Sequence, residues 1–179
     1  MKQSMKLAFC GVIAALSTVL MFLTGLAPTA TLALPAIAGC LLIPVVVEAG
    51  LAWGAGVYGV CCVLSFLLAP DREAFLFYLL FFGYYPVLYA VLGRIRGRVL
   101  RYVAKLLVFN AAVALEVLLS VYVLGVPVES FFILGWIGPV VMWLLANAVF
   151  ILYDLALDGL ILQYYRRLHP RLGKLLKGK

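Results

Sequence analysis

The charges of this chain are confined to a few short segments, and this distribution constrains its fold more than any other feature. All but one of the 14 lysine and arginine residues fall in three clusters, at residues 2–6, 94–105 and 166–179. Long apolar stretches separate the clusters, so that 67% of the 179 residues are hydrophobic and only 12% are charged. A soluble domain carries about 25% charged residues. The sequence therefore predicts an all-α, polytopic membrane helix bundle that forms a single domain.

Turn residues divide the apolar stretches into segments long enough to cross a bilayer, which takes about 20 residues per helix. One clear break is Pro70-Asp71, where Asp71 is a natural N-cap for the helix that follows. The six expected transmembrane helices are residues 7–26, 32–47, 51–68, 73–92, 102–124 and 131–163, the last with a helix-breaking pair at Gly138-Pro139.

The basic clusters predict the orientation, because positively charged loops stay in the cytoplasm. Six spans place both termini and the Arg94–Lys105 loop on that side of the plasma membrane, and leave only Arg72 outside. The outer loops are then residues 25–31, 70–72 and 125–130, whereas five or seven spans would break the pattern. The net charge of +7 indicates contact with membrane lipids of the inner leaflet and no nucleic-acid partner.

The glycines at positions 54, 56 and 59 have the G-x-G-x-x-G spacing of a dinucleotide-binding turn. That spacing indicates dinucleotide binding only where it follows a strand and opens a helix of a βαβ unit. Here it lies inside an expected membrane helix, where Ala52, Gly56 and Gly59 share one face. Small residues at that spacing let helices approach closely in lipid, so the motif predicts a packing groove.

The sequence offers no catalytic set, and we expect no catalytic residue, metal or cofactor. The only histidine, His169, lies in the basic tail, and the four cysteines lie in apolar runs without metal-ligand or disulfide spacing. Asp154-x3-Asp158-Gly159 resembles part of the acidic motif of membrane CDP-alcohol phosphotransferases. No acidic residue follows Asp158, however, so the metal ligands of that motif are missing. A non-enzymatic role is expected.

Polar residues within the spans are the candidates for function, because each is costly in lipid unless it is partnered. Asn147, Asp154 and Asp158 line one stripe, at i, i+7 and i+11. For Asp158 and for Glu48, pairing with an arginine of a basic loop is the expected structural role. Glu116 and Asn147 lie near the membrane centre, where no basic residue is expected, so a ligand contact and a structural hydrogen bond remain open for both.

The fourth span contains Pro86, which removes one backbone hydrogen bond and predicts a kink. Tyr84 and Tyr85 could offer hydroxyls to a ligand there, or could only satisfy the kink. A ligand pocket in the outer half of the bundle would be capped by aromatic residues. Its candidate substrate-binding residues are Tyr84, Tyr85, Glu116, Ser120, Trp136 and Asn147.

The size, the six spans and the small residues of the first helix resemble the S component of energy-coupling factor (ECF) transporters. The resemblance implies a membrane subunit that captures a small molecule such as a vitamin. It also implies docking through small residues of the first helix onto a transmembrane coupling protein driven by ATPase subunits. The matching residues here are Gly11-x-x-x-Ala15, with Ala8 and Thr18 continuing the face.

Two further resemblances lead elsewhere. The residues Pro70-Asp71-Arg72-Glu73-Ala74, followed by Phe81–Pro86, resemble a family of small Gram-positive membrane proteins without an assigned function. A six-span chain without a catalytic set also resembles the cell-shape family MreD, whose members hold envelope machinery together. A structural membrane partner is therefore the alternative to a substrate-binding subunit.

Overall fold

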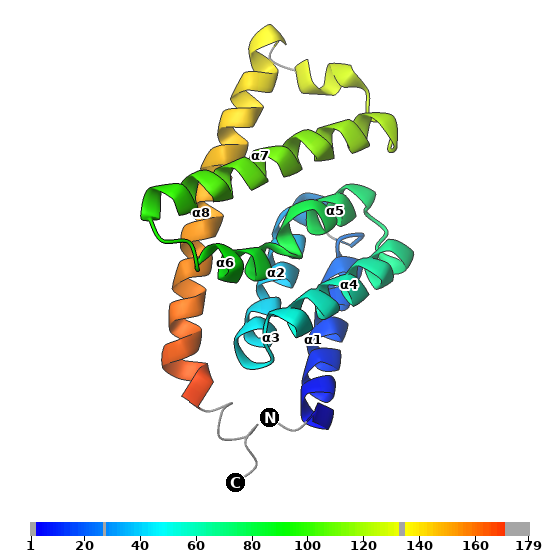
Figure 1. Cartoon of the computed structure of the whole chain (residues 1–179). Coiled ribbons are helices and arrows are strands. Elements are labelled where there is room, and N and C mark those ends of the chain that lie inside the picture. The colour runs from blue at the N-terminus through cyan, green and yellow to red at the C-terminus, as the bar shows by residue number, and fades with distance from the viewer. Residues whose placement is uncertain (1–2, 27, 133–134, 171–179) are drawn as a thin grey trace.

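The computed structural model describes residues 3–26, 28–132 and 135–170, and within these ranges the chain is helical without a strand (Figure 1). Its elements are α1 (Gln3–Leu23), η1 (Pro28–Ala30), α2 (Ala33–Cys40), α3 (Leu42–Glu48), α4 (Leu51–Leu68), α5 (Arg72–Phe77), η2 (Tyr78–Phe82), α6 (Tyr85–Leu92), α7 (Arg98–Tyr122), η3 (Val128–Phe132), η4 (Gly135–Ile137), α8 (Gly138–Gln163) and η5 (Tyr164–Leu168). The expected all-α class is confirmed.

Five helical segments of the described chain are long and apolar enough to cross a membrane. They are Gln3–Leu23, Leu51–Leu68, Arg72–Leu92, Arg98–Tyr122 and Gly135–Leu168. Outward-facing leucine, valine and isoleucine side chains cover them, and α8 buries only four of its 26 residues. An apolar exterior of this kind suits lipid and not water.

The expected span at residues 32–47 is a shorter apolar stretch, Ala33–Glu48, divided into α2 and α3 at Leu41. Pro44 lacks the amide hydrogen that would bond to the carbonyl of Cys40, and this loss places the break there. A helix of this length rises about 24 Å, less than the ~30 Å of a hydrocarbon core. Six crossings therefore remain a proposal.

The segment from Arg72 to Leu92 is interrupted, as Pro86 predicts. Asp71 caps its start, since its carboxylate accepts a hydrogen bond from the amide of Ala74 at 3.1 Å. A wide π turn, η2, then leads into Gly83 and Tyr84, after which α6 begins with Pro86 in its first turn. The final expected span begins later than residue 131, because Val128–Phe132 and Gly135–Ile137 form separate short turns and α8 starts at Gly138.

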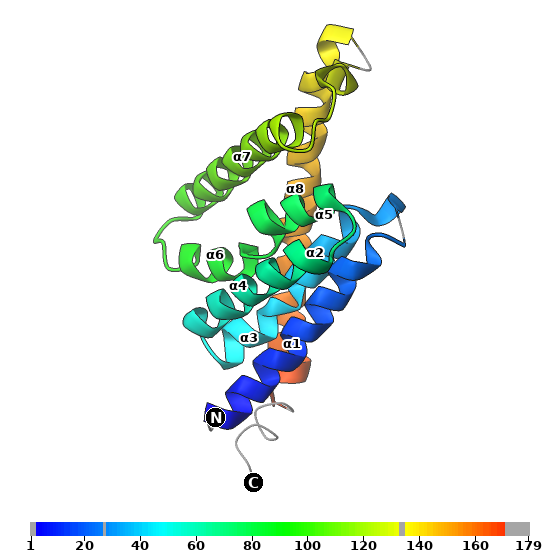
Figure 2. The ribbon, with the colours of Figure 1, turned by 90° about the vertical axis from the view of Figure 1, so that its right-hand side faces the viewer.

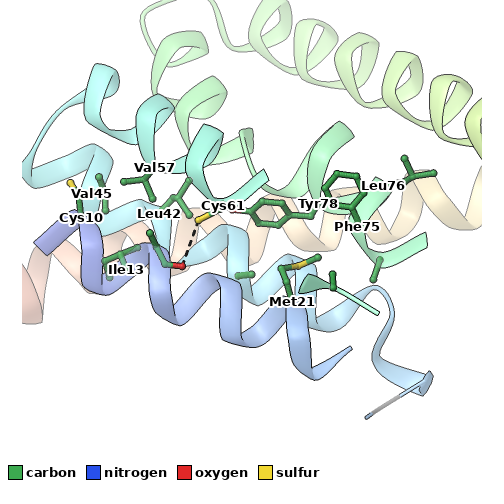
Figure 3. Close-up of a cluster of buried hydrophobic side chains, with 14 residues drawn as sticks. Cys10, Ile13, Met21, Leu42, Val45, Val57, Cys61, Phe75, Leu76 and Tyr78 are labelled. Atoms are coloured by element: carbon green, nitrogen blue, oxygen red, sulfur yellow. Dashed lines mark hydrogen bonds between the residues drawn. The ribbon is translucent and has the colours of Figure 1, made fainter. Parts of the chain in front are cut away.

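Two clusters of buried hydrophobic side chains hold the bundle together. The first lies between α1, α2, α3, α4 and the α5–η2 segment, and Met21, Leu42 and Tyr78 are fully buried in it (Figure 3). The second is mostly aromatic and joins η2 and α6 to α7 and α8. In it the rings of Phe109 and Phe150 are stacked, with centroids 4.5 Å apart.

The helices are arranged unevenly around these clusters. α1 packs along α4, whereas α7 crosses α8 and the outer parts of both extend beyond the rest of the bundle (Figures 1 and 2). The start of α1 and the end of η5 lie at the same end of the molecule. An even number of crossings would produce that arrangement.

Candidate functional site

An ion pair is buried where α6, α7 and α8 meet. Lys105 Nζ on α7 lies 2.7 Å and 2.9 Å from the two carboxylate oxygens of Asp154 on α8. The side chains are only 4% and 3% exposed, respectively. The hydroxyl of Tyr85 on α6 donates a hydrogen bond of 2.6 Å to Asp154 Oδ1. Three helices therefore contribute to one neutralised charge pair.

A second carboxylate continues this cluster toward the end of α8. Tyr89, one helical turn after Tyr85, donates its hydroxyl to Asp158 Oδ1, and Lys105 Nζ lies 4.1 Å from the centre of the Tyr89 ring. The expected pairing of Asp158 with a basic-loop arginine is wrong, because no ion pair of the described residues includes it. The hydrogen-bond partner of Asp158 is the Tyr89 hydroxyl instead.

Glu48, at the end of α3, is also partnered differently from the expectation. Its carboxylate oxygen Oε1 lies 2.7 Å from His169 Nδ1 and accepts a hydrogen bond of 2.9 Å from the hydroxyl of Tyr164. No arginine of the described chain pairs with it. These contacts join the end of α3 to the end of the η5 turn, 121 residues later in the chain.

The ion pair lies well inside the spans and not at their ends. Asp154 precedes Arg166 by more than three helical turns, about 18 Å along the axis, and Lys105 follows Arg98 by about two turns. Sequence analysis assigned Lys105 to the cytoplasmic basic cluster and missed it as a partner of Asp154. A signal was present, since Lys105 shares its helical face with Phe109 and Ala112, which are buried too.

A neutral polar group lies between α7 and α8, further from the basic clusters. The side chains of Asn110 and Asn147 bond to each other, with Asn110 Nδ2 3.0 Å from Asn147 Oδ1. Trp143 donates its indole N–H to Asn110 Oδ1 at 2.6 Å. With the ion pair, these residues form a polar seam that follows the predicted stripe along α8.

The candidate substrate-binding residues have different partners. Glu116 accepts a hydrogen bond of 2.9 Å from Ser120, and these two are the only members of the set bonded to each other in the described chain. Tyr84 contacts the Tyr58 ring edge-on, at a centroid distance of 5.9 Å. Trp136 lies in η4 with 92% of its surface exposed. Tyr85 and Asn147 belong to the polar seam.

An open groove of about 380 Å³ runs between α1 and α4. Its walls are entirely apolar or small, and none of the candidate substrate-binding residues lines it. They are Leu7, Cys10, Gly11 and Ala14 from α1, and Ala52, Trp53, Gly56, Val57 and Val60 from α4. A methyl group added at Gly11 or Gly56 would meet no atom within 4 Å.

This groove coincides with part of the expected docking face. Gly11 lines it, and Ala8 and Ala15 are exposed beside it on α1. Thr18 does not continue the exposed face, because it is buried and bonds to the carbonyl oxygen of Ala14. The predicted groove of Ala52, Gly56 and Gly59 on α4 faces the same opening through its first two members.

The described residues contain no group of histidine, cysteine and carboxylate side chains that could hold a metal ion. No protein-family model, curated protein or solved structure matches the chain.

Proposed function

We propose that this protein is a non-catalytic membrane subunit that docks a partner's transmembrane helix on α1 and α4. The function we propose is the one that the resemblance to ECF S components implies. The subunit would bind a small molecule such as a vitamin, and a coupling protein with ATPase subunits would energise its uptake. The observation that supports it best is the open groove at Gly11 and Gly56, beside the exposed Ala8 and Ala15.

The shape of the groove favours a helix as its occupant. Small residues on a membrane helix allow two backbones to approach within van der Waals contact, which is the main attraction between helices in lipid. The groove is lined by such residues on both helices, and no part of the described chain fills it at Gly11 or Gly56.

For the substrate, the proposed polar centre is Glu116. It is partly buried and has one hydrogen-bond partner, Ser120, so its carboxylate retains capacity for a ligand. Tyr84, Tyr85, Asn147 and the exposed Trp136 complete the proposed set.

The docking test replaces Gly11 or Ala15 with leucine and measures which proteins co-purify from gently solubilised membranes. We expect either change to remove a transmembrane coupling protein and its ATPases, because the larger side chain blocks close approach. Gly59→Leu is the matched control, since Gly59 is exposed in α4 but does not line the groove. Retention of every partner by both α1 variants would contradict the proposal.

A specific observation favours the second candidate, a structural partner of envelope machinery like MreD. The candidate substrate residues belong to separate hydrogen-bonded groups, and the polar seam already satisfies two of them. Thermal shift against a vitamin panel separates the two candidates. A vitamin that stabilises the wild type but not Glu116→Gln supports uptake, whereas association only with cell-wall proteins supports the structural role.

A further inference from the structure

Four arginines at the junction of α6 and α7 form no ion pair with a carboxylate of the described residues. They are Arg94, Arg96, Arg98 and Arg101, which we call the basic turn. No acidic residue occurs between Glu73 and Glu116, and the two ion pairs of the described chain use Lys105 and His169 instead. The acidic residue near them, Asp158, is bonded to Tyr89. Even with Asp158 counted, the local charge is strongly positive.

Exposed apolar side chains accompany these charges on the first two turns of α7. Val99 is 78% exposed and Leu100 is 59% exposed, and Tyr102 and Val103 are about half exposed. Arginines alternating with aliphatic and aromatic side chains at the start of a membrane helix are typical of the boundary between headgroups and acyl chains. This composition suits a position at the level of the phosphate groups of a bilayer.

Arg101 adds a more local observation. Its Nε is buried without an acceptor, and its Nη2 makes only a long contact of 3.4 Å to the carbonyl oxygen of Ile95. A guanidinium offers N–H groups in a planar fork that fits two phosphate oxygens. Gly97 has a positive φ of 123°. The chain turns sharply at this residue, so that the carbonyl oxygen of Ile95 comes close to the guanidinium group of Arg101.

We propose that the basic turn is a binding surface for the headgroups of anionic phospholipids. The phosphate would contact the arginines while the acyl chains lie along Val99, Leu100 and Val103. An acidic protein segment would satisfy the charges equally well but would leave those apolar side chains in water. This inference does not depend on the docking or substrate role proposed above.

The test titrates the purified protein in detergent with dioleoyl phosphatidylglycerol or dioleoyl phosphatidylcholine and counts bound lipids by native mass spectrometry. We expect the wild type to prefer phosphatidylglycerol. Arg96→Gln/Arg98→Gln should weaken that binding about thirtyfold, because each arginine near an anionic surface contributes about 1 kcal/mol. Phosphatidylcholine binding should stay unchanged.

The matched control is Arg166→Gln/Arg167→Gln, which removes two exposed arginines from η5. It should lose clearly less phosphatidylglycerol affinity than the basic-turn variant, because it leaves all four arginines of the basic turn in place. Arg101→Lys keeps the charge but removes the planar fork, so it should weaken binding while folding normally. Glycerol phosphate at millimolar concentration should not compete, since it lacks acyl chains.

Four results would overturn the proposal. The first is equal affinity of the wild type for both lipids, and the second is an equal loss in the basic-turn and control variants. The third is displacement by glycerol phosphate, which would assign the surface to a soluble phosphate. Capture of an acidic protein without any lipid preference would likewise assign it to a protein partner.

Discussion

At the scale of single residues, Lys105 and Asp154 stabilise the bundle only as a pair. Both are nearly inaccessible, and the rings of Tyr89 and Tyr85 enclose them. A lone charge in such surroundings keeps its desolvation penalty and loses its attraction to the opposite charge. Removing one partner should therefore be worse than removing both.

The corresponding prediction compares Lys105→Met, Asp154→Leu and the double variant. Each single change should lower the free energy of unfolding by about 3–5 kcal/mol, and the double variant should recover most of that loss. Denaturant unfolding in mixed micelles measures these energies. Arg98→Met, which removes an exposed cation from the same helix, is the control and should cost little. Additive losses in the double variant would show that the charges do not act as a pair.

Sequence analysis identified part of this cluster. The spacing of Asn147, Asp154 and Asp158 placed them on one stripe, and the stripe does carry the polar seam. Their partners could not be identified, because Lys105 follows four arginines and has the appearance of a loop residue. Only its registry with Phe109 and Ala112 distinguishes it, and which helix α7 would face depends on tertiary packing.

At the scale of elements, the close approach of α2 to η2 depends on a glycine. A methyl group at Gly39 would lie 2.2 Å from the carbonyl oxygen of Phe82, a contact that backbone atoms cannot relieve by a rotamer change. That carbonyl belongs to the last residue of η2, just before the break that precedes α6. Packing of α2 on this segment therefore requires position 39 to have no side chain.

We expect Gly39→Ala to lower the free energy of unfolding by about 1–3 kcal/mol, the usual cost of forcing extra volume into a packed core. Gly59→Ala is the matched control, because a methyl group there meets no atom within 4 Å and alanine favours a helix. Thermal unfolding of both purified variants tests this contrast. Equal melting temperatures for the two would contradict the backbone contact.

The elements were predicted correctly where residues close in sequence determine them. Asp71 and Pro86 act on their own neighbours, so the cap and the interruption could be predicted from sequence, and both are present. The span at residues 32–47 was expected to be one helix, although Pro44 was visible in it. Whether such a proline bends a helix or divides it depends on what packs against the freed carbonyl, and sequence periodicity does not contain that information.

At the scale of the whole molecule, the positions of the two chain ends and of the charge clusters bear on the predicted orientation in the membrane. The start of α1, the basic turn and η5 carry seven of the nine lysine and arginine residues of the described chain. The first and last of these lie at the same end of the bundle (Figure 1). If the positive charges are cytoplasmic, as their distribution predicts, the stretch Ala33–Glu48 would have to complete a sixth crossing despite its length, with help from local thinning of the bilayer.

This orientation predicts the accessibility of single cysteines introduced after Cys10, Cys40, Cys61 and Cys62 have been replaced. In intact cells an impermeant thiol reagent should label Thr29→Cys and Ser130→Cys, which are exposed in the expected outer loops, and should not label Arg96→Cys in the basic turn. Permeabilised cells are the control, because all three positions should then react. Labelling of Arg96→Cys from outside would place a basic cluster across the membrane from the cytoplasm. The stretch Ala33–Glu48 would then lie within the bundle without crossing it, and five crossings would replace six.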